Sequence, residues 1–431
     1  MSIVLTKDFS KHVGETVTVR GWLYNKRSSG PLAFLEIRDG YSFTQAVAAK
    51  AALAPAIWEE VEKVNQESSV IITGTVAKHP KKENVYELQV TDFKIVQLAV
   101  DFPIAKKEHG PDFLMDNRHL WLRSKRQWAI LRIRDGIIMA INEYLHQQNF
   151  IKVDSPIFTP NACEGTTTLF AVPYFDLGTA YLSQSGQLYI EAAIASVGRC
   201  YDFGPVFRAE KSKTKRHLTE FWMMDAEGAF VEHEENLQIQ EGLVRHIVRY
   251  SLEHCKEELA ILERDVEKLK KADAPFTRYT YDQAIVKLHE LGSDIKHGED
   301  LGNDDEGLLT QDSVVPVFIE RWPKEIKPFY MKRDPQNEKY VLNDDLIATD
   351  GGGEIIGGSQ REENVDVIIE RMKAEGLNQA DYEWYLDIRR YGSVPHSGFG
   401  IGLERAVRWI TGAEHIREAI PFPRTIGRLK P

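Results

Sequence analysis

The chain has 431 residues, 42% hydrophobic and 28% charged, a balance typical of globular proteins at a length that exceeds one ordinary domain. We therefore expect two or three folded units. The formal net charge of −11 excludes a protein that coats nucleic acid through overall positive charge, although it does not exclude a local basic surface.

Three cysteines, Cys163, Cys200 and Cys255, lack the spacing of a zinc site or a disulfide framework. Their scatter favours a reducing compartment, the cytoplasm. The N-terminal segment carries charges at Lys7 and Asp8, where a signal peptide needs an apolar run, and no later segment approaches membrane-spanning length. We expect a soluble protein that is not exported and has no membrane partner.

Residues 1–98 contain short runs rich in β-branched and aromatic residues, separated by Gly and Asp. They predict five strands that close into a small barrel, with a helix after the third strand as in an OB-fold. The second and third strands usually form the ligand face of such a barrel, and they carry Arg27, Phe34 and Gln45. Phe34 could stack on an unpaired base and Gln45 could read its edge. The alternative is that Phe34 is a core residue of its strand.

Residues 99–125 mix Pro, Gly and charge and predict a hinge between modules. From Arg126 to Leu145, apolar residues recur at helical spacing, which predicts a long amphipathic helix. An extended segment that contains Pro156 follows this helix.

The segment from Gly204 to Glu227 predicts two antiparallel strands joined by a loop dense in Lys and Arg. Arg208 and Glu210 are expected on one face of the first strand, and Phe221 on the second. A guanidinium, a carboxylate and an aromatic ring on one surface suit a nucleotide, although a solvated basic hairpin tip would have the same pattern.

The part of the chain after this hairpin is predicted to be helical from residue 231 to about 272. We expect the acidic segment 296–307 to be a surface excursion that does not touch the chemistry. Strand patterns return near residue 314, and the strands that follow supply two candidate carboxylates, Asp345 and Glu354.

Three segments resemble the motifs of the class II aminoacyl-tRNA synthetases, in the subgroup that charges aspartate, asparagine and lysine. FIKVDSP (150–156) resembles motif 1, FRAE followed by RHLTEF (207–221) resembles motif 2, and GFGIGLER (398–405) resembles motif 3. The similarity continues through EGTT (164–167), QSGQLY (184–189) and GGSQR (357–361), so it covers nearly the whole chain.

The resemblance implies an α+β protein with an OB-fold anticodon-binding domain (1–98), a hinge (99–125) and a class II catalytic domain (126–431), an antiparallel sheet flanked by helices. It also implies a homodimer in which the motif 1 helix and strand form the interface. A plain intramolecular core could give the same apolar pattern in these elements.

The implied activity is an AMP-forming ligation that activates L-asparagine with ATP and transfers it to tRNA(Asn). Adenylate formation needs aligned anions and positioned cations more than a nucleophile or a general base. Arg208 matches the contact to the α-phosphate and Arg405 the contact to the γ-phosphate end, so both are implied as catalytic. The further residues implied to bind ATP are Glu210, Arg216, His217, Leu218, Phe221, Glu354 and Gly402. Asp345 and Glu354 match the magnesium carboxylates, and Mg²⁺ prefers such hard oxygen ligands.

The residues that read the amino acid favour asparagine. Aspartyl enzymes of the subgroup carry a lysine where this chain has Ile190, so one cation, Arg361, and one anion, Asp225, remain to complement an amide. Glu164, Ser185 and Gln187 match contacts to the substrate's α-amino end. The asparagine-charging members usually have Glu at the position of Asp225, and the shorter side chain here leaves a gap of ~1.5 Å.

Other interpretations remain open at this point. The chain could be a non-discriminating aspartyl-tRNA synthetase that charges both tRNAs. It could be an asparagine synthetase-like paralogue that kept the catalytic fold, although such an enzyme would not need the N-terminal barrel. It could also be a nonenzymatic OB-fold protein that binds nucleic acid.

Overall fold

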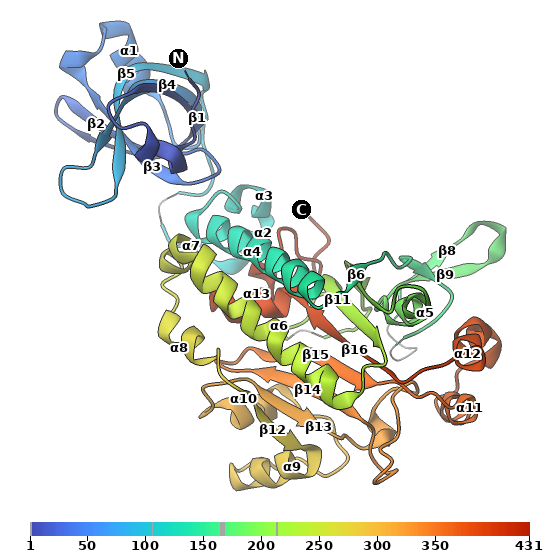
Figure 1. Cartoon of the computed structure of the whole chain (residues 1–431). Coiled ribbons are helices and arrows are strands. Elements are labelled where there is room, and N and C mark those ends of the chain that lie inside the picture. The colour runs from blue at the N-terminus through green and yellow to red at the C-terminus, as the bar shows by residue number, and fades with distance from the viewer. Residues whose placement is uncertain (1, 106, 164–168, 213) are drawn as a thin grey trace. The chain divides into compact units, whose positions relative to one another are not determined.

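The computed structural model describes residues 2–105, 107–163, 169–212 and 214–431, and it divides the chain into two compact units, Met1–Gly110 and Pro111–Pro431 (Figure 1). The boundary lies inside the segment predicted as a hinge. Helices α2 (Pro111–Asp116) and α3 (Arg118–Trp121) follow it directly. The buried Arg118 donates hydrogen bonds to the carbonyl oxygens of Ile420 and Pro421, both at 2.8 Å, so this part of the segment packs into the second unit.

The first unit is a closed barrel in the strand order β1-β2-β3-β5-β4. Its elements are η1 (Thr6–Lys11), β1 (Thr16–Ser29), β2 (Leu32–Arg38), β3 (Phe43–Ala49), η2 (Lys50–Ala52), α1 (Pro55–Lys63), β4 (Ser69–Lys78) and β5 (Tyr86–Gln97). Side chains alternate along β2, so Ala33 and Leu35 lie in the barrel core and Phe34 lies half-buried outside it. These findings confirm the OB-fold prediction and exclude the interpretation of Phe34 as a barrel core residue.

The second unit is built on an eight-stranded sheet in the order β12-β13-β14-β15-β16-β11-β10-β6. The strands are β6 (Ile151–Lys152), β10 (Arg199–Phe207), β11 (Glu220–Ala229), β12 (Thr277–Thr280), β13 (Val317–Glu320), β14 (Asn343–Ala348), β15 (Gly353–Gln360) and β16 (His396–Gly402). The pairs at the two ends of this order, β6 with β10 and β12 with β13, are parallel, and the pairs between them are antiparallel. The sheet and its helices confirm the α+β fold class, although the sheet is mixed and not purely antiparallel as predicted, because its two outermost pairs are parallel.

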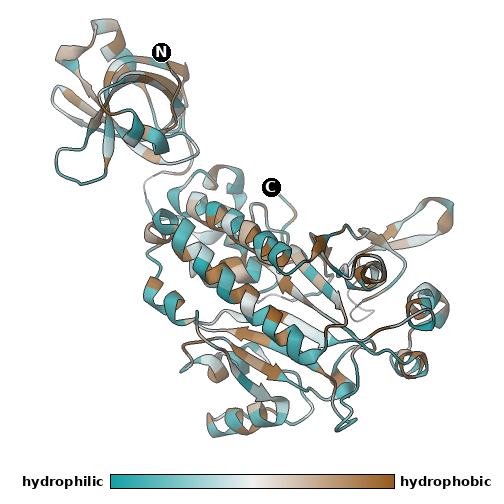
Figure 2. Cartoon of the chain, in the orientation of Figure 1, coloured by the Kyte–Doolittle hydropathy of each residue, from teal (hydrophilic) through white to brown (hydrophobic). Residues whose placement is uncertain are grey.

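Two long helices cover one side of this sheet, α4 (Lys125–Gln147) and α6 (His233–His254). The Ser124 side chain caps α4 by accepting a hydrogen bond from the backbone N–H of Gln127. Isoleucines spaced along α4 join leucines of α6 and the apolar side chains of the sheet in one large core. Figure 2 shows both helices with mixed teal and brown turns, as expected for helices that have one buried and one solvated side.

The remaining elements surround this core. A small sheet contains β7 (Phe158–Thr159), β9 (Thr179–Leu182) and β8 (Ala171–Pro173) in that order. The other helices are α5 (Gln187–Val197), α7 (Lys256–Ile261), α8 (Val266–Lys271), α9 (Tyr281–Glu290), α10 (Asn303–Thr310), α11 (Val365–Ala374), α12 (Glu383–Arg390) and α13 (Leu403–Thr411), with short 3₁₀ turns at η4 (Phe175–Leu177), η5 (Lys324–Ile326), η6 (Gln379–Tyr382) and η7 (Ile416–Glu418). Within the described ranges, no helix has both the length and the apolar character needed to cross a membrane.

Candidate active site

One cavity of about 1350 Å³, a volume that includes the space at its mouth, gathers nearly all of the predicted catalytic-domain residues. Its lining includes Ser185, Gln187, Arg208, Glu210, Arg216, His217, Leu218, Phe221, Asp225, Asp345, Glu354, Arg361, Gly402 and Arg405. These residues come from β11, β14, β15 and β16, from the loop between β10 and β11, and from α5 and α13, with Ser185 just before α5 and Arg361 just after β15. The remaining predicted residue of this unit, Glu164, lies outside the described residues.

The hairpin of β10 and β11 forms as its sequence predicts, but β10 ends at Phe207, so Arg208 and Glu210 lie in the loop and not on the first strand. Val206 pairs with Phe221 across the two strands, and the Arg208 guanidinium lies 5.6 Å from the centre of the Phe221 ring. In the loop, a His217 ring nitrogen lies 3.8 Å from a Glu210 carboxylate oxygen. Burial and the nearby arginine Arg405 lower the pKa of His217, so a neutral ring is favoured at this position.

Arg405 reaches the site from the first turn of α13. Its Nη1 atom donates to the backbone carbonyl of Glu354 at 2.8 Å and to the Glu354 carboxylate at 3.1 Å. Burial raises the pKa of Glu354 and Arg405 lowers it, and the net direction is downward, so this carboxylate favours its ionised form. A cation and an anion thus meet at one end of the cavity.

The acidic segment touches the site, so the prediction of a surface excursion without contact to the chemistry is wrong. Asp300 lines the cavity. Glu306, on α10, is buried, pairs with Arg216 and accepts a hydrogen bond from the backbone N–H of Glu354 at 3.1 Å. Gly353 has φ +74°, and a Cβ atom there would lie 2.2 Å from Arg216 Nη1, so glycine is needed for the Arg216 side chain to pass this turn.

Two carboxylates, Asp345 and Glu354, and one half-buried lysine, Lys327, also line the cavity. A Cβ atom on Gly357 would lie 3.4 Å from Glu354 Oε1 and 3.7 Å from Asp345 Oδ1, so both carboxylates overhang this glycine. Lys327 donates to Asp345 at 2.7 Å, and its Nζ lies 3.9 Å from the centre of the Trp322 ring. Burial and the neighbouring Glu354 raise the pKa of Asp345 to about 7, while Lys327 opposes the rise.

The oxygen atoms of Asp345 and Glu354 fit a divalent cation. Within the described part of the chain, no group of three or more His, Cys, Asp or Glu side chains is placed to hold a metal ion. Mg²⁺ needs only one or two carboxylates when water and substrate phosphates complete its octahedron. The two overhanging carboxylates therefore provide a donor set of the right chemistry.

At the other end of the cavity, Asp225 is fixed by the start of α5. One of its oxygens, Oδ2, accepts hydrogen bonds from Ser185 Oγ and from the backbone N–H of Gly186, both at 2.8 Å. A Cβ atom on Gly400 would lie 2.6 Å from the other oxygen, Oδ1, so β16 approaches this carboxylate closely because it has glycine there. The position of Asp225 is thus set by three elements, β11, α5 and β16.

The observed environment of Arg361 differs from the predicted one. The Nε and Nη2 atoms of Arg361 donate to the Glu227 carboxylate at 3.1 and 2.9 Å, and its Nη1 atom donates to Ser359 Oγ at 2.6 Å. The predicted cation and anion, Arg361 and Asp225, both line the cavity, but the charges near the amide end also include a second anion, Glu227, which pairs with Arg361. Ile190 is packed with Ile194 and Cys200 in an apolar cluster and does not line the cavity.

The three predicted anticodon residues lie on neighbouring strands of the first unit. Arg27 on β1 is opposite Phe34 on β2. Gln45 on β3 is opposite Glu36, and its side-chain amide donates to Glu87 at 3.0 Å. The structure thus places a cation and a half-buried ring side by side, with Gln45 engaged by an acidic neighbour.

Comparisons with known proteins identify the family. The family described as tRNA synthetases class II (D, K and N) matches residues 110–426, and the OB-fold nucleic acid binding domain matches residues 17–96. The chain belongs to the class II tRNA synthetases of the D, K and N group. This synthetase is accordingly an AMP-forming ligase that uses ATP.

Solved structures agree over the full length of this synthetase. It is 43% identical to asparaginyl-tRNA synthetase from Pyrococcus horikoshii complexed with asparaginyl-adenylate, with a TM-score of 0.94 and coverage of 98% of this chain and 97% of that chain. It is 32% identical to the Entamoeba histolytica asparaginyl-tRNA synthetase, also in complex with asparaginyl-adenylate, with a TM-score of 0.90 and coverage of 100% and 99%. Aspartyl tRNA synthetase from Entamoeba histolytica is 28% identical, with a TM-score of 0.82 and coverage of 100% and 93%.

Several residues at or behind the site of this synthetase were not predicted from its sequence. Glu227 is two residues from Asp225 on β11, so strand alternation places both on the same face and could have revealed it. Glu191 is one helical turn from the predicted residue Gln187, so the two side chains are neighbours on one helix face, but this spacing is a weaker indication. Lys327 and Glu306 stand in loop and helix segments whose approach to the cavity no local pattern encodes.

Proposed function

We propose that this synthetase is an asparagine–tRNA ligase, which activates L-asparagine with ATP to asparaginyl-adenylate and transfers the asparaginyl group to tRNA(Asn). The observation that carries the proposal is the amide end of the cavity, where the Asp225 carboxylate and the Arg361 guanidinium both face the substrate space. An amide presents one acceptor and two donors, so it can accept from the guanidinium and donate to the carboxylate. The similarity to two asparaginyl enzymes supports the same substrate.

The chemistry follows from the cations of the cavity. The carboxylate of asparagine attacks the α-phosphorus of ATP, a new carbon–oxygen–phosphorus linkage forms, and pyrophosphate leaves in line. Arg208 binds the α-phosphate, where charge builds in the transition state, and Arg405 binds the γ-phosphate end. Phe221 covers the adenine, and the loop residues Arg216 and His217 hold the trailing phosphates.

The remaining predicted ATP contacts complete this assignment: Glu210, Leu218, Glu354 and Gly402 line the same nucleotide space. Asp345 and Glu354 would hold Mg²⁺, which supplies charge neutralisation at the phosphates when it is bound. Lys327 already pairs with Asp345, so a cation bound here would share that carboxylate with Lys327. Ser185, Gln187 and Glu164 are assigned to the α-amino end of asparagine.

The test is ATP–pyrophosphate exchange measured with asparagine and, in parallel, with aspartate. We expect exchange that depends on asparagine and on magnesium, is lost when EDTA is added, and is accompanied by charging of tRNA(Asn). Asparagine-dependent exchange without tRNA charging would indicate a synthetase-like paralogue instead. No exchange with either amino acid would contradict the proposal.

One observation favours a second candidate, a non-discriminating aspartyl-tRNA synthetase. Asp225 is one methylene shorter than the glutamate usual at this position in asparagine-charging members of the subgroup, and its Oδ2 atom is held by Ser185 and Gly186. A carboxylate that lies farther from the substrate side chain repels the β-carboxylate of aspartate less, so the site would reject aspartate less strongly. Equal exchange efficiencies with the two amino acids would favour this candidate.

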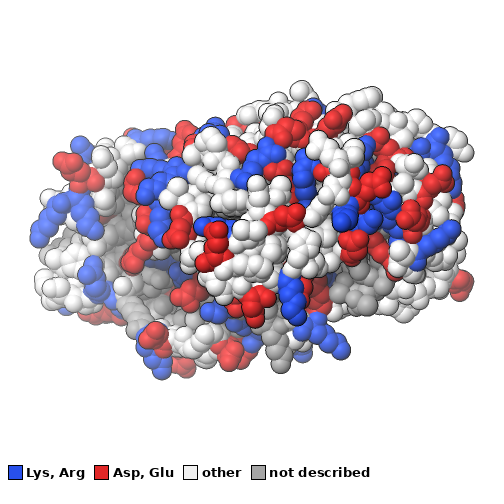
Figure 3. All heavy atoms as spheres, turned by 90° about the horizontal axis from the view of Figure 1, so that it is seen from below, with Lys and Arg blue, Asp and Glu red and all other residues white. Residues whose placement is uncertain are grey.

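The barrel is proposed to bind the anticodon of the tRNA through Arg27, Phe34 and Gln45. Figure 3 views the molecule from below the orientation of Figure 1, and the face that it shows carries Lys and Arg intermixed with Asp and Glu. Binding at the barrel would depend on local contacts such as base stacking.

Replacing Phe34 with alanine is therefore expected to weaken tRNA charging while asparagine-dependent exchange is unchanged. Stacking on a base contributes about 1 to 3 kcal/mol, which corresponds to a 5-fold to 150-fold rise in the KM for tRNA. Replacing Val96, an exposed apolar residue of β5 in the same barrel, serves as the control and should leave both activities unchanged. Equal charging by the Phe34 variant and the parent enzyme would contradict the assignment.

We also propose a homodimer formed through the motif 1 segment. Apolar side chains are exposed in this segment at Ile151 and directly after it at Ile157 and Phe158, and Trp222 is exposed close by. Such a surface is typical of an interface between subunits. Analytical ultracentrifugation would show twice the chain mass if the proposal holds. The reaction is assigned to the cytoplasm, as is usual for the family.

A further inference from the structure

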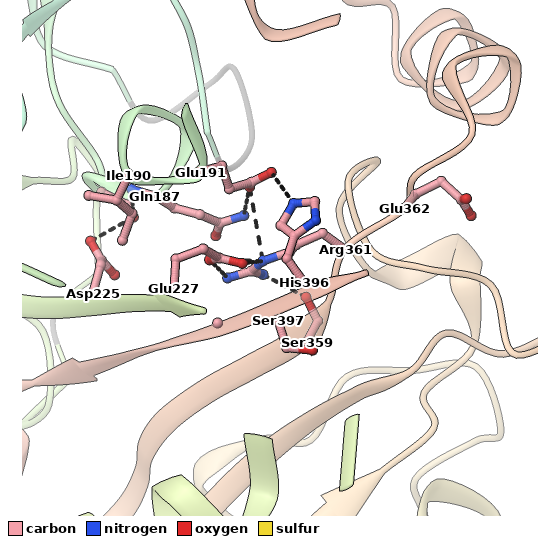
Figure 4. A network of polar contacts seen from close by, with 12 residues as sticks. Gln187, Ile190, Glu191, Asp225, Glu227, Ser359, Arg361, Glu362, His396 and Ser397 are labelled. Carbon is pink, nitrogen blue, oxygen red and sulfur yellow. Dashed lines mark hydrogen bonds and ion pairs between the residues drawn. The ribbon is translucent and has the colours of Figure 1, made fainter. Parts of the chain in front are cut away.

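A buried polar network lies behind the amide end of the cavity, centred on Glu191 of α5 (Figure 4). Its Oε1 atom accepts a hydrogen bond from Gln187 Nε2 at 3.0 Å. Its Oε2 atom accepts from Tyr385 Oη at 2.8 Å and from Arg389, and it lies 3.2 Å from His396 Nε2. We call these five residues the Glu191 network. It connects a residue that lines the cavity, Gln187, to α12 and β16.

The Glu191 network adjoins the arginine that faces the substrate. Glu191 Oε1 lies 3.9 Å from Arg361 Nε, and Arg361 is paired on its other side with Glu227. The side chains of Glu191, Glu227, Arg361 and Arg389 are at most 4% exposed, so water screens none of their charges effectively. Two cations and two anions are thus buried together at one end of the cavity.

The charge state of Glu191 follows from its partners. Burial raises the pKa of this carboxyl, but Arg389 and the further donors around it outweigh burial and hold the pKa well below its usual range. Glu191 is therefore an anion. His396 Nδ1 lies 2.8 Å from the Val394 carbonyl oxygen, so this nitrogen carries a proton, and Nε2 lies between Glu191 and Arg389.

The two pairs give Arg361 a particular chemical character. Each nitrogen of Arg361 has a partner among the described residues. Each Nη atom carries two hydrogens, however, and the contacts given above use one hydrogen on each Nη atom. Arg361 can therefore still donate to a substrate carbonyl. Its positive charge is already balanced, so it offers little to compensate the desolvation of a carboxylate.

We propose that Glu191 is a specificity-determining positioning residue, which balances the buried arginines so that the amide end accepts a neutral carboxamide and disfavours a β-carboxylate. This inference rests on the proposed asparagine–tRNA ligase function. It supplies a physical basis for discrimination against aspartate that does not depend on the length of the residue at position 225. Glu191 touches no substrate in this scheme and acts on the amide end through Arg361, while Gln187, which is assigned to the α-amino end, links the network to the cavity.

The inference predicts effects of opposite sign for the two partners of the buried pair. Glu191→Gln leaves one uncompensated positive charge, so the ratio of aspartate to asparagine exchange efficiency (kcat/KM) should rise by about 10-fold or more. Arg389→Met leaves excess negative charge, so the ratio should stay at or below that of the parent enzyme. The double variant removes both charges and should return the ratio to the parent value. In Glu191→Gln, the loss with asparagine should appear in KM more than in kcat, because ground-state binding of the amide is weakened.

The matched control is Glu67→Gln, which breaks a buried pair of the same chemistry with Arg38 in the barrel and should leave the ratio unchanged. An unchanged ratio in folded Glu191→Gln would overturn the inference. A ratio in the double variant as high as that expected for Glu191→Gln would also overturn it, and this result can be obtained even if the single variant does not fold. Absence of asparagine-dependent exchange in the parent enzyme would instead overturn the proposed function.

Discussion

Replacing Arg405 or Arg208 with alanine is expected to reduce asparagine-dependent pyrophosphate exchange by about 10²-fold or more, with the fold intact. Each guanidinium lines the nucleotide end of the cavity, and contacts that strengthen as charge shifts onto the phosphates contribute to kcat and not only to binding. Arg405 also holds Glu354, so its loss removes a partner from a proposed magnesium ligand. The measurement is steady-state exchange at saturating asparagine, with ATP varied.

A neighbouring arginine provides the control for this experiment. Arg408 lies on the same helix, α13, donates to the backbone carbonyl of Gly351 at 2.9 Å and does not line the cavity. Arg408→Ala should retain exchange to within a few-fold, since it removes a cation of the same kind from outside the site. Retention of full exchange by the Arg405 and Arg208 variants, with circular dichroism unchanged, would contradict their assignment to the phosphates.

Replacing Arg361 with methionine is expected to abolish asparagine activation and to destabilise the protein by about 3 to 5 kcal/mol, because removal of one partner leaves a buried charge uncompensated. The charge in question is Glu227, which is fully buried and whose carboxylate accepts from both Nε and Nη2 of Arg361. Thermal unfolding followed by circular dichroism would measure the loss of stability, and pyrophosphate exchange would measure the loss of activity.

The same variant should show a characteristic pH dependence. Burial and the adjacent Glu191 already raise the pKa of Glu227 above its ordinary value, and Arg361 opposes that rise. Without Arg361 the folded state binds a proton at Glu227 that the unfolded state releases, so the free energy of unfolding must fall as pH rises from the unfolded pKa towards the raised folded pKa. The variant should therefore regain part of its stability as pH is lowered towards the ordinary glutamate pKa.

Arg371→Met distinguishes this effect from the general cost of losing a buried arginine. Arg371 is buried, and its guanidinium donates to the backbone carbonyls of Met331, Lys324 and Lys327. Among the described residues no carboxylate accepts a hydrogen bond from Arg371, but burial raises the pKa of the nearby Glu375 and Arg371 opposes that rise. The loss of stability in Arg371→Met should therefore depend on pH less than that in Arg361→Met. Identical pH dependence in the two variants would contradict the role given to the Arg361–Glu227 pair.

Local patterns were sufficient for the fold and for much of the site. Alternation along the strands and helical spacing from residue 126 predict the barrel and α4, because burial of one face imposes a period of two on a strand and of about 3.6 on a helix. The hairpin of β10 and β11 was predicted in the same way, whereas the carboxylates Asp345 and Glu354 of β14 and β15 were implied by the resemblance to the family. The resemblance to the class II motifs then predicted that residues far apart in sequence belong to one site.

The sequence by itself determined the OB-fold barrel, the α+β catalytic unit, the family and the chemical type of the nucleotide site, since each rests on short-range periodicity or on contiguous motifs. Only the tertiary structure decided that Arg361 is paired with Glu227, that Glu191 stands behind both Gln187 and Arg361, and that Glu306 and Lys327 reach the cavity. It also decided that Ile190 packs into an apolar cluster and that Phe34 lies outside the barrel core. The physical reason is that a side chain's charge balance is set by the partners that folding brings within about 4 Å. Those partners can lie far away in sequence, as Arg389 lies about two hundred residues from Glu191.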